Sequence, residues 1–456
     1  MALRRRVEER QGELWVASQS LPCGPGHVFY QRLNTLLAEV GFDRFVEDLV
    51  EPYYAQNGRP GIAPGVYFRM LFVGYFEGID SQRGIAWRCA DSLSLRSFLG
   101  LGPTEPSPDH SSLTRIRDRY PIDVAEQVFA FVLRMACERK LISGTQVGVD
   151  ATLLEANAAM KSIVRRDSDE DWKAYLRRLM VEEGQIDEDD EPTDEDLRRF
   201  DRSRKGKKVM NDEWKSPVDD DARIVKMKDG RTHFGYKAEH TVDLDSEVLL
   251  SATVQHGTEP DSQTLCDAVV DAQQNLERAG SEVSLHEVAA DKGYHANAQL
   301  AGCEELGLRT YIPEPSSPNQ RKWTDKCDEV IRAVTNNRRR MKRPKGKQLQ
   351  KLRSERVERS FAHLCETGGA RRTWLRGLAK INKRYRVTAA AHNLGLILRS
   401  LFGTGKPREF AALQAACSAI TAALRLLCRT FRPRTERLRK QQTILRTDHQ
   451  PVCVAP

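Results

Sequence analysis

Residues 286–300, HEVAADKGYHANAQL, hold the pattern that decides the fold. An apolar run from Val288 to Ala290 leads directly into Asp291, and the chain then turns at Gly293. Such a run, bounded by turn residues, is typical of a short buried strand. A carboxylate at the end of a buried strand is costly unless it has a partner. The stretch therefore raises the question of which charge Asp291 meets.

Strand and helix patterns alternate on both sides of this stretch. Residues 145–154, TQVGVDATLL, alternate and are rich in β-branched residues, which predicts a strand that contains Asp150. Further strands are expected at 233–245, 247–257 and 309–313, and helices at 261–280, 297–307 and from Trp323 to His363. A hairpin followed by alternating strands and helices predicts an α/β fold, a mixed sheet flanked by helices. Carboxylates at strand ends then meet at one sheet edge, so we expect Asp291 to share a hard cation with Asp150 and with Glu358 from the last helix.

Three such acids suit phosphoryl transfer on nucleic acid. That reaction needs neutralisation of the scissile phosphate and an activated oxygen nucleophile, and two Mg²⁺ ions about 3.5 to 4 Å apart supply both. Magnesium prefers oxygen ligands and keeps several waters, so two or three carboxylates are enough. Spacing alone is a weak signal for this hypothesis, because the chain has 64 acidic residues.

The chain divides into three regions by pattern. Residues 1–140 are expected to be a helical, DNA-binding domain, and residues 141–402 a catalytic domain with a charged insertion at about 160–230 after its first strand. Residues 403–456 are expected to be a helical, basic tail. In the first region, Asp109 is a predicted helix N-cap. The helix after it carries arginines that are candidates for phosphate contacts in the manner of a helix-turn-helix, with a plain basic surface helix as the alternative: Arg115, Arg117 and Arg119.

Charge is distributed unevenly over the chain, which carries a formal net charge of +8. Residues 182–196 are mostly acidic, which predicts a solvated, mobile insert, whereas residues 338–359 are mostly basic. A basic block of this length indicates either a polyanion-binding surface or a solvated helix face. The candidates for DNA contacts in it are Arg338, Arg339, Arg340, Lys342, Arg343, Arg353, Arg356 and Arg359.

Several classes of protein are disfavoured. The ten cysteines show no CxxC pair, so a zinc ribbon or finger is not expected, and their number as free thiols fits a reducing cytosol. The N-terminus lacks the apolar segment of a signal peptide. No GK[ST] phosphate loop is present, which disfavours ATP-driven motors. The most apolar stretch, 410–428, carries a polar stripe and predicts a packed or dimerising helix rather than a membrane span.

Several blocks resemble those of bacterial insertion-sequence transposases of the DDE type. They are VGVDATLLEANAAMKSIVRRD (147–167), HFGYKAEHTVDLDSEVLLSATVQ (233–255), VAADKGYHAN (288–297) and RSERVERSFAHLCETGGARRTWLRGLAKINKRY (353–385). GIDSQRGIAWRCADSLSLRSFLGL and SPDHSSLTRIRDR, at 78–101 and 107–119, are similar to the helical N-terminal domain of those proteins. The match runs in order from about residue 30 to about residue 405.

The resemblance implies an RNase H-like core that cleaves the ends of an insertion sequence and joins the freed 3′-OH to target DNA. It implies two Mg²⁺ ions as cofactors, with Mn²⁺ as a substitute. It further implies terminal inverted repeats and target DNA as partners, a homodimer in the synaptic complex, no membrane, and a bacterial cytoplasmic location at the nucleoid.

Carried over by residue, the resemblance places the catalytic and metal-binding acids at Asp150, Asp291 and Glu358. One departure concerns the surroundings of the Glu. Many relatives have a Tyr seven residues before it, an Arg four before and a Lys seven after, where this chain has Lys351, Ser354 and Cys365. Glu355, one turn earlier on the same helix, therefore stays open as the third acid.

Two other functions compete with transposition. The chain could act as a repressor or a catalytically decayed copy that binds element ends without cutting them. It could also be a structure-selective nuclease on the same core, which would hydrolyse DNA without joining it.

Overall fold

The computed structural model describes residues 26–426, apart from 56, 58–60, 103, 205–210, 317–322, 324–325, 408, 410–418 and 422. Of the predicted helix at 410–428, residues 419–421 and 423–426 are described and are helical; its other residues and most of the expected tail at 403–456 lie outside the described residues. Within the described part of the chain, no helix is long and apolar enough to cross a membrane.

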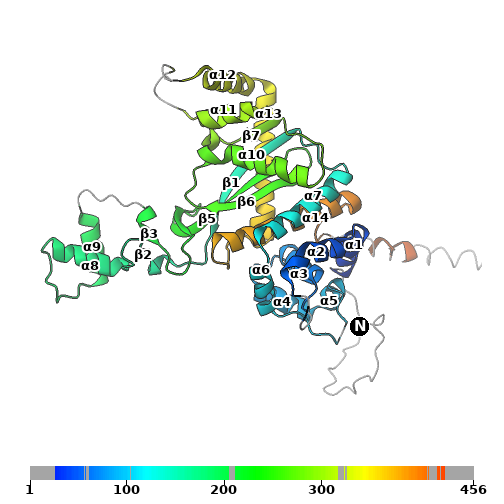
Figure 1. The fold of residues 1–456 in the computed structure, drawn as a ribbon, viewed down its shortest axis with the longest axis horizontal. Coiled ribbons are helices and arrows are strands. Elements are labelled where there is room, and N and C mark those ends of the chain that lie inside the picture. Colours follow the sequence, from blue (N-terminus) through cyan, green and yellow to red (C-terminus); the bar gives the residue numbers. More distant parts are fainter. Residues whose placement is uncertain are drawn as a thin grey trace, which may run out of the picture.

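The first described region is helical. Its helices are α1 (Gly26–Glu39), α2 (Phe42–Val50), η2 (Glu51–Tyr53), α3 (Pro64–Glu77), α4 (Gln82–Asp91), α5 (Leu93–Phe98), α6 (His110–Arg119) and α7 (Ile122–Glu138). Asp109 caps α6 as expected, because its carboxylate accepts a hydrogen bond from the Ser111 N–H at 2.8 Å. Helices α1 to α6 group on one side of the sheet region, and α7 passes alongside the sheet (Figure 1).

The centre of the fold is a six-stranded mixed sheet. Its strands are β1 (Gln146–Glu155), β4 (Arg223–Lys226), β5 (Thr232–Asp243), β6 (Leu249–His256), β7 (Glu287–Ala290) and β8 (Arg309–Tyr311). β5 pairs antiparallel with β1 on one edge and with β6 and β4 on the other. β7 pairs parallel with β1, and β8 pairs parallel with β7. The expected mixed sheet flanked by helices is confirmed.

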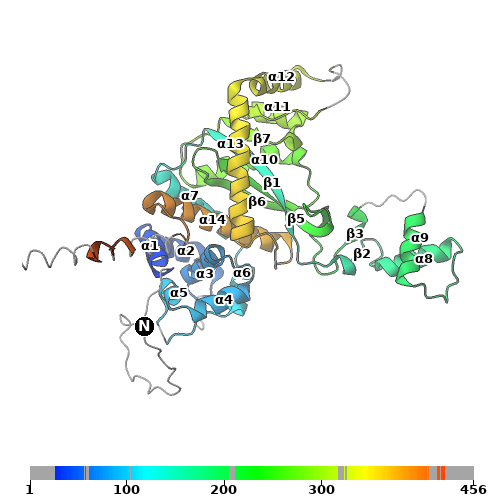
Figure 2. The same ribbon diagram turned by 180° about the vertical axis from the view of Figure 1, so that it is seen from behind.

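Helices cover both faces of this sheet. On one face lies α10 (Asp261–Arg278), whose Ala268 carbonyl accepts a hydrogen bond from Thr241 of β5 at 3.2 Å. On the other face lie α13 (Pro344–Phe361) and α14 (Leu378–Phe402), and His240 of β5 contacts both of them. Figure 2 shows α13 lying across the sheet, in front of its strands. The remaining elements of this region are η5 (Lys292–Tyr294), α11 (Asn297–Glu305), α12 (Asp328–Lys342) and η6 (Ala362–Thr367).

A glycine lets α13 lie close to the sheet. A Cβ on Gly148 of β1 would stand 2.8 Å from a methyl carbon of Val357 on α13 and 2.8 Å from a methyl carbon of Leu244. Separations this short are repulsive, so any larger residue would push the helix outward. Gly148 therefore fixes the distance between α13 and the strand that carries Asp150.

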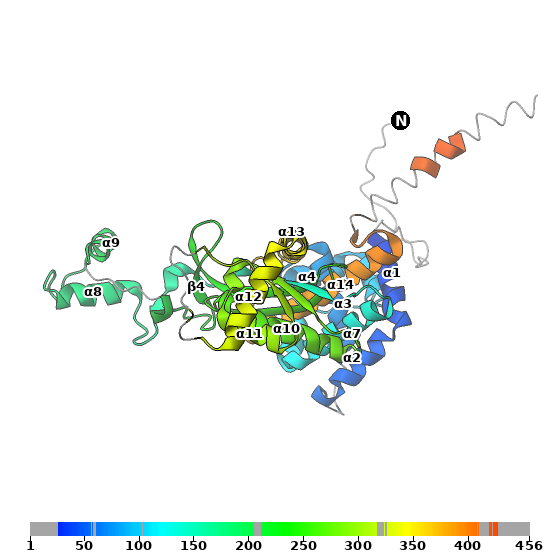
Figure 3. The same ribbon diagram turned by 90° about the horizontal axis from the view of Figure 1, so that it is seen from above.

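The chain between β1 and β4 forms a separate extension. Its elements are η3 (Met160–Ser162), β2 (Val164–Arg165), α8 (Trp172–Glu182), α9 (Asp194–Ser203), η4 (Asn211–Glu213) and β3 (Trp214–Lys215). Helices α8 and α9 enclose a small apolar cluster of their own: Leu176, Met180, Leu197 and Phe200. The extension points away from the sheet, on the side opposite α1 (Figures 1 and 3). The acidic block at 182–196 lies between and within its two helices.

Candidate functional site

The register of two neighbouring strands brings Asp150 and Asp291 together. β1 and β7 run parallel, and Val149 of β1 is the partner of Ala290 of β7. Asp150 and Asp291 are the next residues on each strand, so they occupy adjacent positions on the same face of the sheet. This is the face that α13 covers, because Gly148, two residues before Asp150, meets α13.

Asp150 is held on both oxygens. Its Oδ1 accepts a hydrogen bond from the Ala151 N–H at 2.8 Å, and its Oδ2 accepts one from Nη1 of Arg353 at 2.7 Å. Burial raises the pKa of the Asp150 carboxyl above its ordinary value; the nearby Arg353 opposes this rise and the charge of Asp291 adds to it.

Asp291 lacks such partners. Its side chain is half-buried at the end of β7, and its carboxylate makes no hydrogen bond with the described residues. Two carboxylates side by side, one of them without a counter-charge, form a site that attracts a cation. Their oxygens are the donor type that Mg²⁺ prefers, so these two residues fit the expected metal.

Glu358 is an exposed residue on the same flank of α13 as Gln350. Gln350 defines this flank, because its side chain donates to the Ala290 carbonyl at 3.1 Å and to the Tyr311 carbonyl at 2.5 Å. Ser354 and Glu358 follow Gln350 at steps of four residues and share its stripe on the helix. The Ser354 hydroxyl also donates to Glu358 at 2.9 Å.

Glu355 has a different environment on the same helix. It accepts a hydrogen bond from Arg359 at 2.7 Å, and Arg359 in turn donates to Glu247 in the turn between β5 and β6. That turn lies at the opposite end of β1, where Asp243 pairs with Val147. Glu358 is thus exposed, with a hydrogen bond from Ser354 of its own helix, whereas Glu355 is tied through Arg359 to the turn between β5 and β6.

The three expected acids do not form one closed cluster. Asp150 and Asp291 are neighbours and Glu358 is an exposed residue on the facing helix. In the part of the chain that the structure describes, no three His, Cys, Asp or Glu side chains are grouped closely enough to hold a metal ion. The position beside Asp150 is taken by the guanidinium of Arg353.

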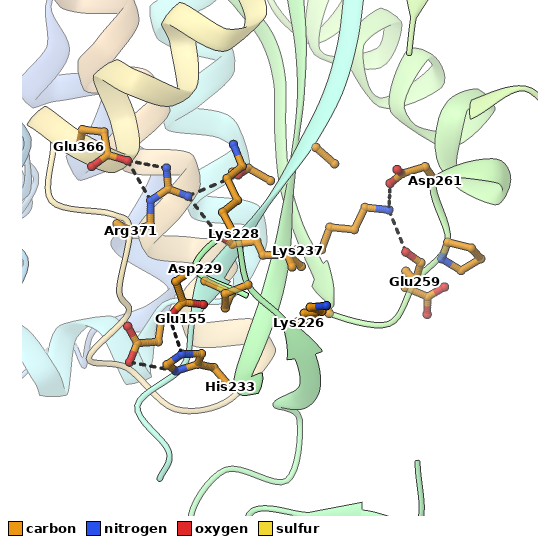
Figure 4. A pocket seen from close by; sticks show the side chains of 16 residues that line it. Glu155, Lys226, Lys228, Asp229, His233, Lys237, Glu259, Asp261, Glu366 and Arg371 are labelled. Atoms are coloured by element: carbon orange, nitrogen blue, oxygen red, sulfur yellow. Dashed lines mark hydrogen bonds and ion pairs between the residues drawn. The ribbon is translucent and has the colours of Figure 1, made fainter. Parts of the chain in front are cut away.

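A groove of about 700 Å³ begins at Ala151, the residue after Asp150. It runs along the part of β1 that extends beyond β7, since β7 pairs with β1 only up to Val149. The opposite wall comes from β4, the turn after it and the start of β5. Ten charged or titratable side chains line the groove (Figure 4): Glu155, Lys226, Lys228, Asp229, His233, Lys237, Glu259, Asp261, Glu366 and Arg371.

Most charges in this groove are paired. Lys237 forms an ion pair with Asp261, Arg371 with Glu366, and His233 with Asp229 at 3.2 Å (Figure 4). Lys226 and Lys228 are exposed and form no ion pair with the described residues. These two ammonium groups are therefore the groove's available cations.

The expected DNA-contacting residues fall into two groups. Arg115, Arg119, Arg339, Lys342 and Arg343 are exposed. The others are engaged within the protein. Arg117 is buried beside Asp118, and Arg338 forms an ion pair with Glu314 at 2.7 Å. Arg340 donates to the Thr310 carbonyl at 3.0 Å.

The three arginines on α13 are engaged as well. Arg353 pairs with Asp150, and Arg356 and Arg359 both pair with Glu247. An arginine in such a pair is less available to a phosphate, because binding would leave its acidic partner without a counter-charge.

The sequence interpretation missed three contributors. Lys226 and Lys228 were placed in the insertion, although the Asp-Gly turn of KMKDGRTHF is a hairpin signal that predicts β4 and β5 around it. The contact of Arg353 with Asp150 has no sequence signal of its own. It depends on where α13 crosses β1, which the pattern of either element does not reveal.

The fold and the site together define an α/β protein in which two parallel strands carry neighbouring carboxylates beneath a basic helix, Asp150 within β1 and Asp291 directly after β7. Comparison with protein families finds a Transposase domain (DUF772) at residues 19–119 and a Transposase DDE domain at residues 314–398. The two matches support a DDE-type insertion-sequence transposase, and they confirm the resemblance noted in the sequence. The DDE match includes Glu358 but neither Asp150 nor Asp291. Neither the curated proteins nor the solved structures contain a match to this chain.

Proposed function

We propose that this transposase binds the ends of its insertion sequence, cleaves them by metal-dependent phosphoryl transfer and joins the 3′-OH ends to target DNA. The observation that carries the proposal is the adjacency of Asp150 and Asp291 on parallel strands. The strand order β6-β5-β1-β7-β8 supports an RNase H-like core, because three antiparallel strands are followed by two that run parallel to β1.

Asp150, Asp291 and Glu358 would hold two Mg²⁺ ions, for which Mn²⁺ substitutes. When bound, such ions lower the pKa of a water and stabilise a leaving 3′ oxygen. The protein's own contribution is to fix the donors. The Ala151 N–H orients one oxygen of Asp150, and the Ser354 hydroxyl orients the carboxylate of Glu358. Glu358 is preferred to Glu355 because it shares the flank of Gln350, which contacts the residue before Asp291.

The DNA strand would continue from the two aspartates into the groove that starts at Ala151. Lys226 and Lys228 would contact its phosphates there, and exposed cations elsewhere would hold the duplex: Arg115, Arg119, Arg339, Lys342 and Arg343. Residues 1–140 would form the end-binding domain, 141–402 the catalytic domain with its insertion at about 160–230, and 403–456 a basic tail. A homodimer would hold two element ends together, at the bacterial nucleoid.

A second candidate function is end binding without catalysis. Two observations favour it. Glu358 is not grouped with both aspartates in the described residues, and Lys351, Ser354 and Cys365 replace the signature around it. A repressor of this kind would still protect the terminal repeats from nuclease digestion. It would release no labelled strand in the presence of Mg²⁺ or Mn²⁺.

The deciding experiment uses labelled DNA that carries the inverted repeats flanking the coding region. We expect the native chain to cleave these ends with Mg²⁺ and to join them to a plasmid, and we expect Asp291→Asn to bind the ends without cleaving them. A native chain that binds but never cuts would favour the repressor. Cleavage without any joined product would favour the structure-selective nuclease.

A further inference from the structure

A second cavity, of about 190 Å³, lies where the N-terminal helices meet the catalytic region. The segment between α3 and α4 contributes Asp80, β1 contributes Leu154, and α14 contributes Arg384 and Thr388. The segment before α14 adds a further wall that includes Trp374. The cavity is separate from the aspartate pair and from the groove that starts at Ala151, and no residue of the proposed catalytic set lines it.

Arg384 is a cation of this cavity that feels the charge of Asp80 but forms no ion pair with it. Its Nη1 atom is shielded from solvent and has no hydrogen-bond partner, and its guanidinium forms no ion pair with any described residue. Burial lowers the pKa of Arg384 to about 10, while the nearby Tyr67 and Asp80 act in the opposite direction. The group is therefore still charged at neutral pH. Arg384 is half-buried, and a charge that is partly withdrawn from water without an ion pair is stabilised by an added anion.

The one acidic side chain that lines the cavity is already engaged. Oδ2 of Asp80 accepts a hydrogen bond from the indole N–H of Trp374 at 2.5 Å. Trp374 itself is 46% exposed, and the guanidinium of Arg372 lies 4.9 Å from its ring centroid. With the described residues, Arg372 forms one ion pair, with Glu155 at 3.8 Å. The cavity thus presents two guanidinium groups and an aromatic face against one carboxylate, which keeps its charge and accepts a hydrogen bond from Trp374 of the same cavity.

The packing around Arg384 is shaped to admit its head group. Gly74 of α3 lies against it, and a Cβ at this position would stand 2.5 Å from Nη2 of Arg384 and 2.7 Å from a methyl carbon of Ile85. The glycine leaves the space that the guanidinium fills. A planar guanidinium offers parallel N–H groups that match two oxygens of one phosphate, a geometry that an ammonium group does not provide.

We propose that this cavity is a phosphate-binding site in which Arg384 is the counter-ion, and that its ligand is a phosphate group, either free or part of a nucleic-acid strand. The site joins residues of the N-terminal helices to residues of α14 and β1, so a bound phosphate stabilises this junction. The proposal does not depend on metal-dependent cleavage, because Asp150, Asp291 and Glu358 take no part in this cavity.

The test is thermal unfolding of the full-length chain in EDTA, with inorganic phosphate or with chloride at equal ionic strength. Ligand that binds only the folded chain raises the midpoint, and we expect phosphate to raise it by about 2 °C or more at ten times the dissociation constant. Arg384→Met should abolish this shift. Arg376→Met, which removes the same charge from an exposed residue outside the cavity, should retain it.

A native chain with no phosphate-specific shift, or an Arg384→Met variant that keeps the full shift, overturns the proposal. If Arg384→Met does not fold, Arg384→Lys replaces it, since lysine keeps the charge and loses the planar fork. We expect Arg384→Lys to bind phosphate at least about fivefold more weakly than the native chain. Equal affinity would show that the guanidinium is not the ligand-binding group.

A second arm identifies the source of the phosphate. Binding of a short DNA duplex is measured in EDTA by fluorescence anisotropy for the same two Met variants. A loss of about tenfold in affinity for Arg384→Met, but not for Arg376→Met, assigns the site to nucleic acid. Unchanged DNA affinity together with a lost phosphate shift assigns it to free phosphate. Both experiments are done in EDTA without a divalent metal. Their outcomes therefore do not depend on whether the chain cleaves DNA.

Discussion

Arg353 of α13 donates a hydrogen bond to Oδ2 of Asp150 across the face of the sheet, at 2.7 Å. The pair joins the helix that carries Glu358 to the strand that carries the first expected acid. The carboxylate of the neighbouring Asp291 makes no hydrogen bond with the described residues. A guanidinium in this position does part of what a divalent cation would do, because it offsets the charge of Asp150.

The first prediction follows from the competition between Arg353 and a metal ion for the carboxylate of Asp150. Arg353→Met should lower the Mg²⁺ concentration that gives half-maximal DNA cleavage, because Asp150 becomes available and a repelling charge is removed. We expect a shift of about threefold to tenfold, roughly 0.6 to 1.4 kcal/mol. Arg356→Met is the matched control, since Arg356 sits on the same helix but pairs with Glu247. Equal Mg²⁺ requirements in both variants and the native chain would contradict the competition.

The second prediction separates the two glutamates of α13. Glu358→Gln should reduce strand cleavage by about a thousandfold, which is about 4 kcal/mol of transition-state stabilisation, because it removes a negatively charged oxygen donor. Glu355→Gln should change cleavage by less than about tenfold, since Glu355 only accepts a hydrogen bond from Arg359. Single-turnover cleavage of labelled ends measures both. The reverse order of effects would move the third acid to Glu355.

Much of the architecture could be predicted from local pattern. The β-branched alternation at 145–154 predicts β1, and the apolar run before Asp291 predicts β7. β7 runs parallel to β1 and ends beside Val149, so Asp150 and Asp291 meet where β7 stops and β1 continues. These features depend on short-range periodicity, which a single sequence records directly.

Contacts between distant elements could not be predicted in this way. The basic run from 338 to 359 suggests a DNA-binding face, but α12 and α13 are separate helices that meet at Pro344 and turn several arginines inward. Arg356 and Arg359 form ion pairs with Glu247, which lies more than a hundred residues earlier in the chain. Whether an arginine is free or paired depends on such long-range packing, and composition alone does not encode it.

The third prediction concerns the close approach of α13 to β1. Gly148→Ala should destabilise the protein by about 1 to 3 kcal/mol, because the added methyl group overlaps Val357 and Leu244. Gly102→Ala is the control, since a Cβ there meets only Glu105, at 3.5 Å or more. Urea unfolding of both variants gives the difference. A Gly148→Ala protein as stable as the control would mean that α13 does not lie this close to the strand.

The fourth prediction concerns the exposed cations near the start of α13. Replacing Arg339, Lys342 and Arg343 by Ala should weaken binding to non-specific duplex DNA and reduce the slope of log affinity against log salt by about 2 to 3. Replacing Arg338 by Ala should change the slope by less than about 1, because Arg338 is already paired with Glu314. Anisotropy titrations at several salt concentrations measure both slopes. Equal slopes for the triple variant and the native chain would exclude this end of α12 from the DNA interface.

The fifth prediction concerns a buried histidine that joins α14 to α3. Nδ1 of His392 lies 2.9 Å from the hydroxyl of Tyr75, and burial holds the pKa of His392 well below its ordinary value. A histidine whose pKa is depressed by folding contributes stability above the pKa of the unfolded chain, about 6.5, and this stability is lost as the pH falls below that value. The native chain should therefore lose about 1.4 kcal/mol through this residue between pH 8 and pH 5.5.

His392→Gln keeps a polar side chain beside Tyr75 and removes the titrating group. The difference in unfolding free energy between pH 8 and pH 5.5 should therefore be smaller for His392→Gln than for the native chain by about that 1.4 kcal/mol. His286→Gln, at an exposed position, should leave the native pH dependence unchanged. Urea titrations at the two pH values measure each difference. If the unfolding free energy of His392→Gln falls between pH 8 and pH 5.5 by as much as that of the native chain, His392 does not remain neutral in the folded chain. Its contact with Tyr75 is then not the reason for acid sensitivity at the junction of α3 and α14.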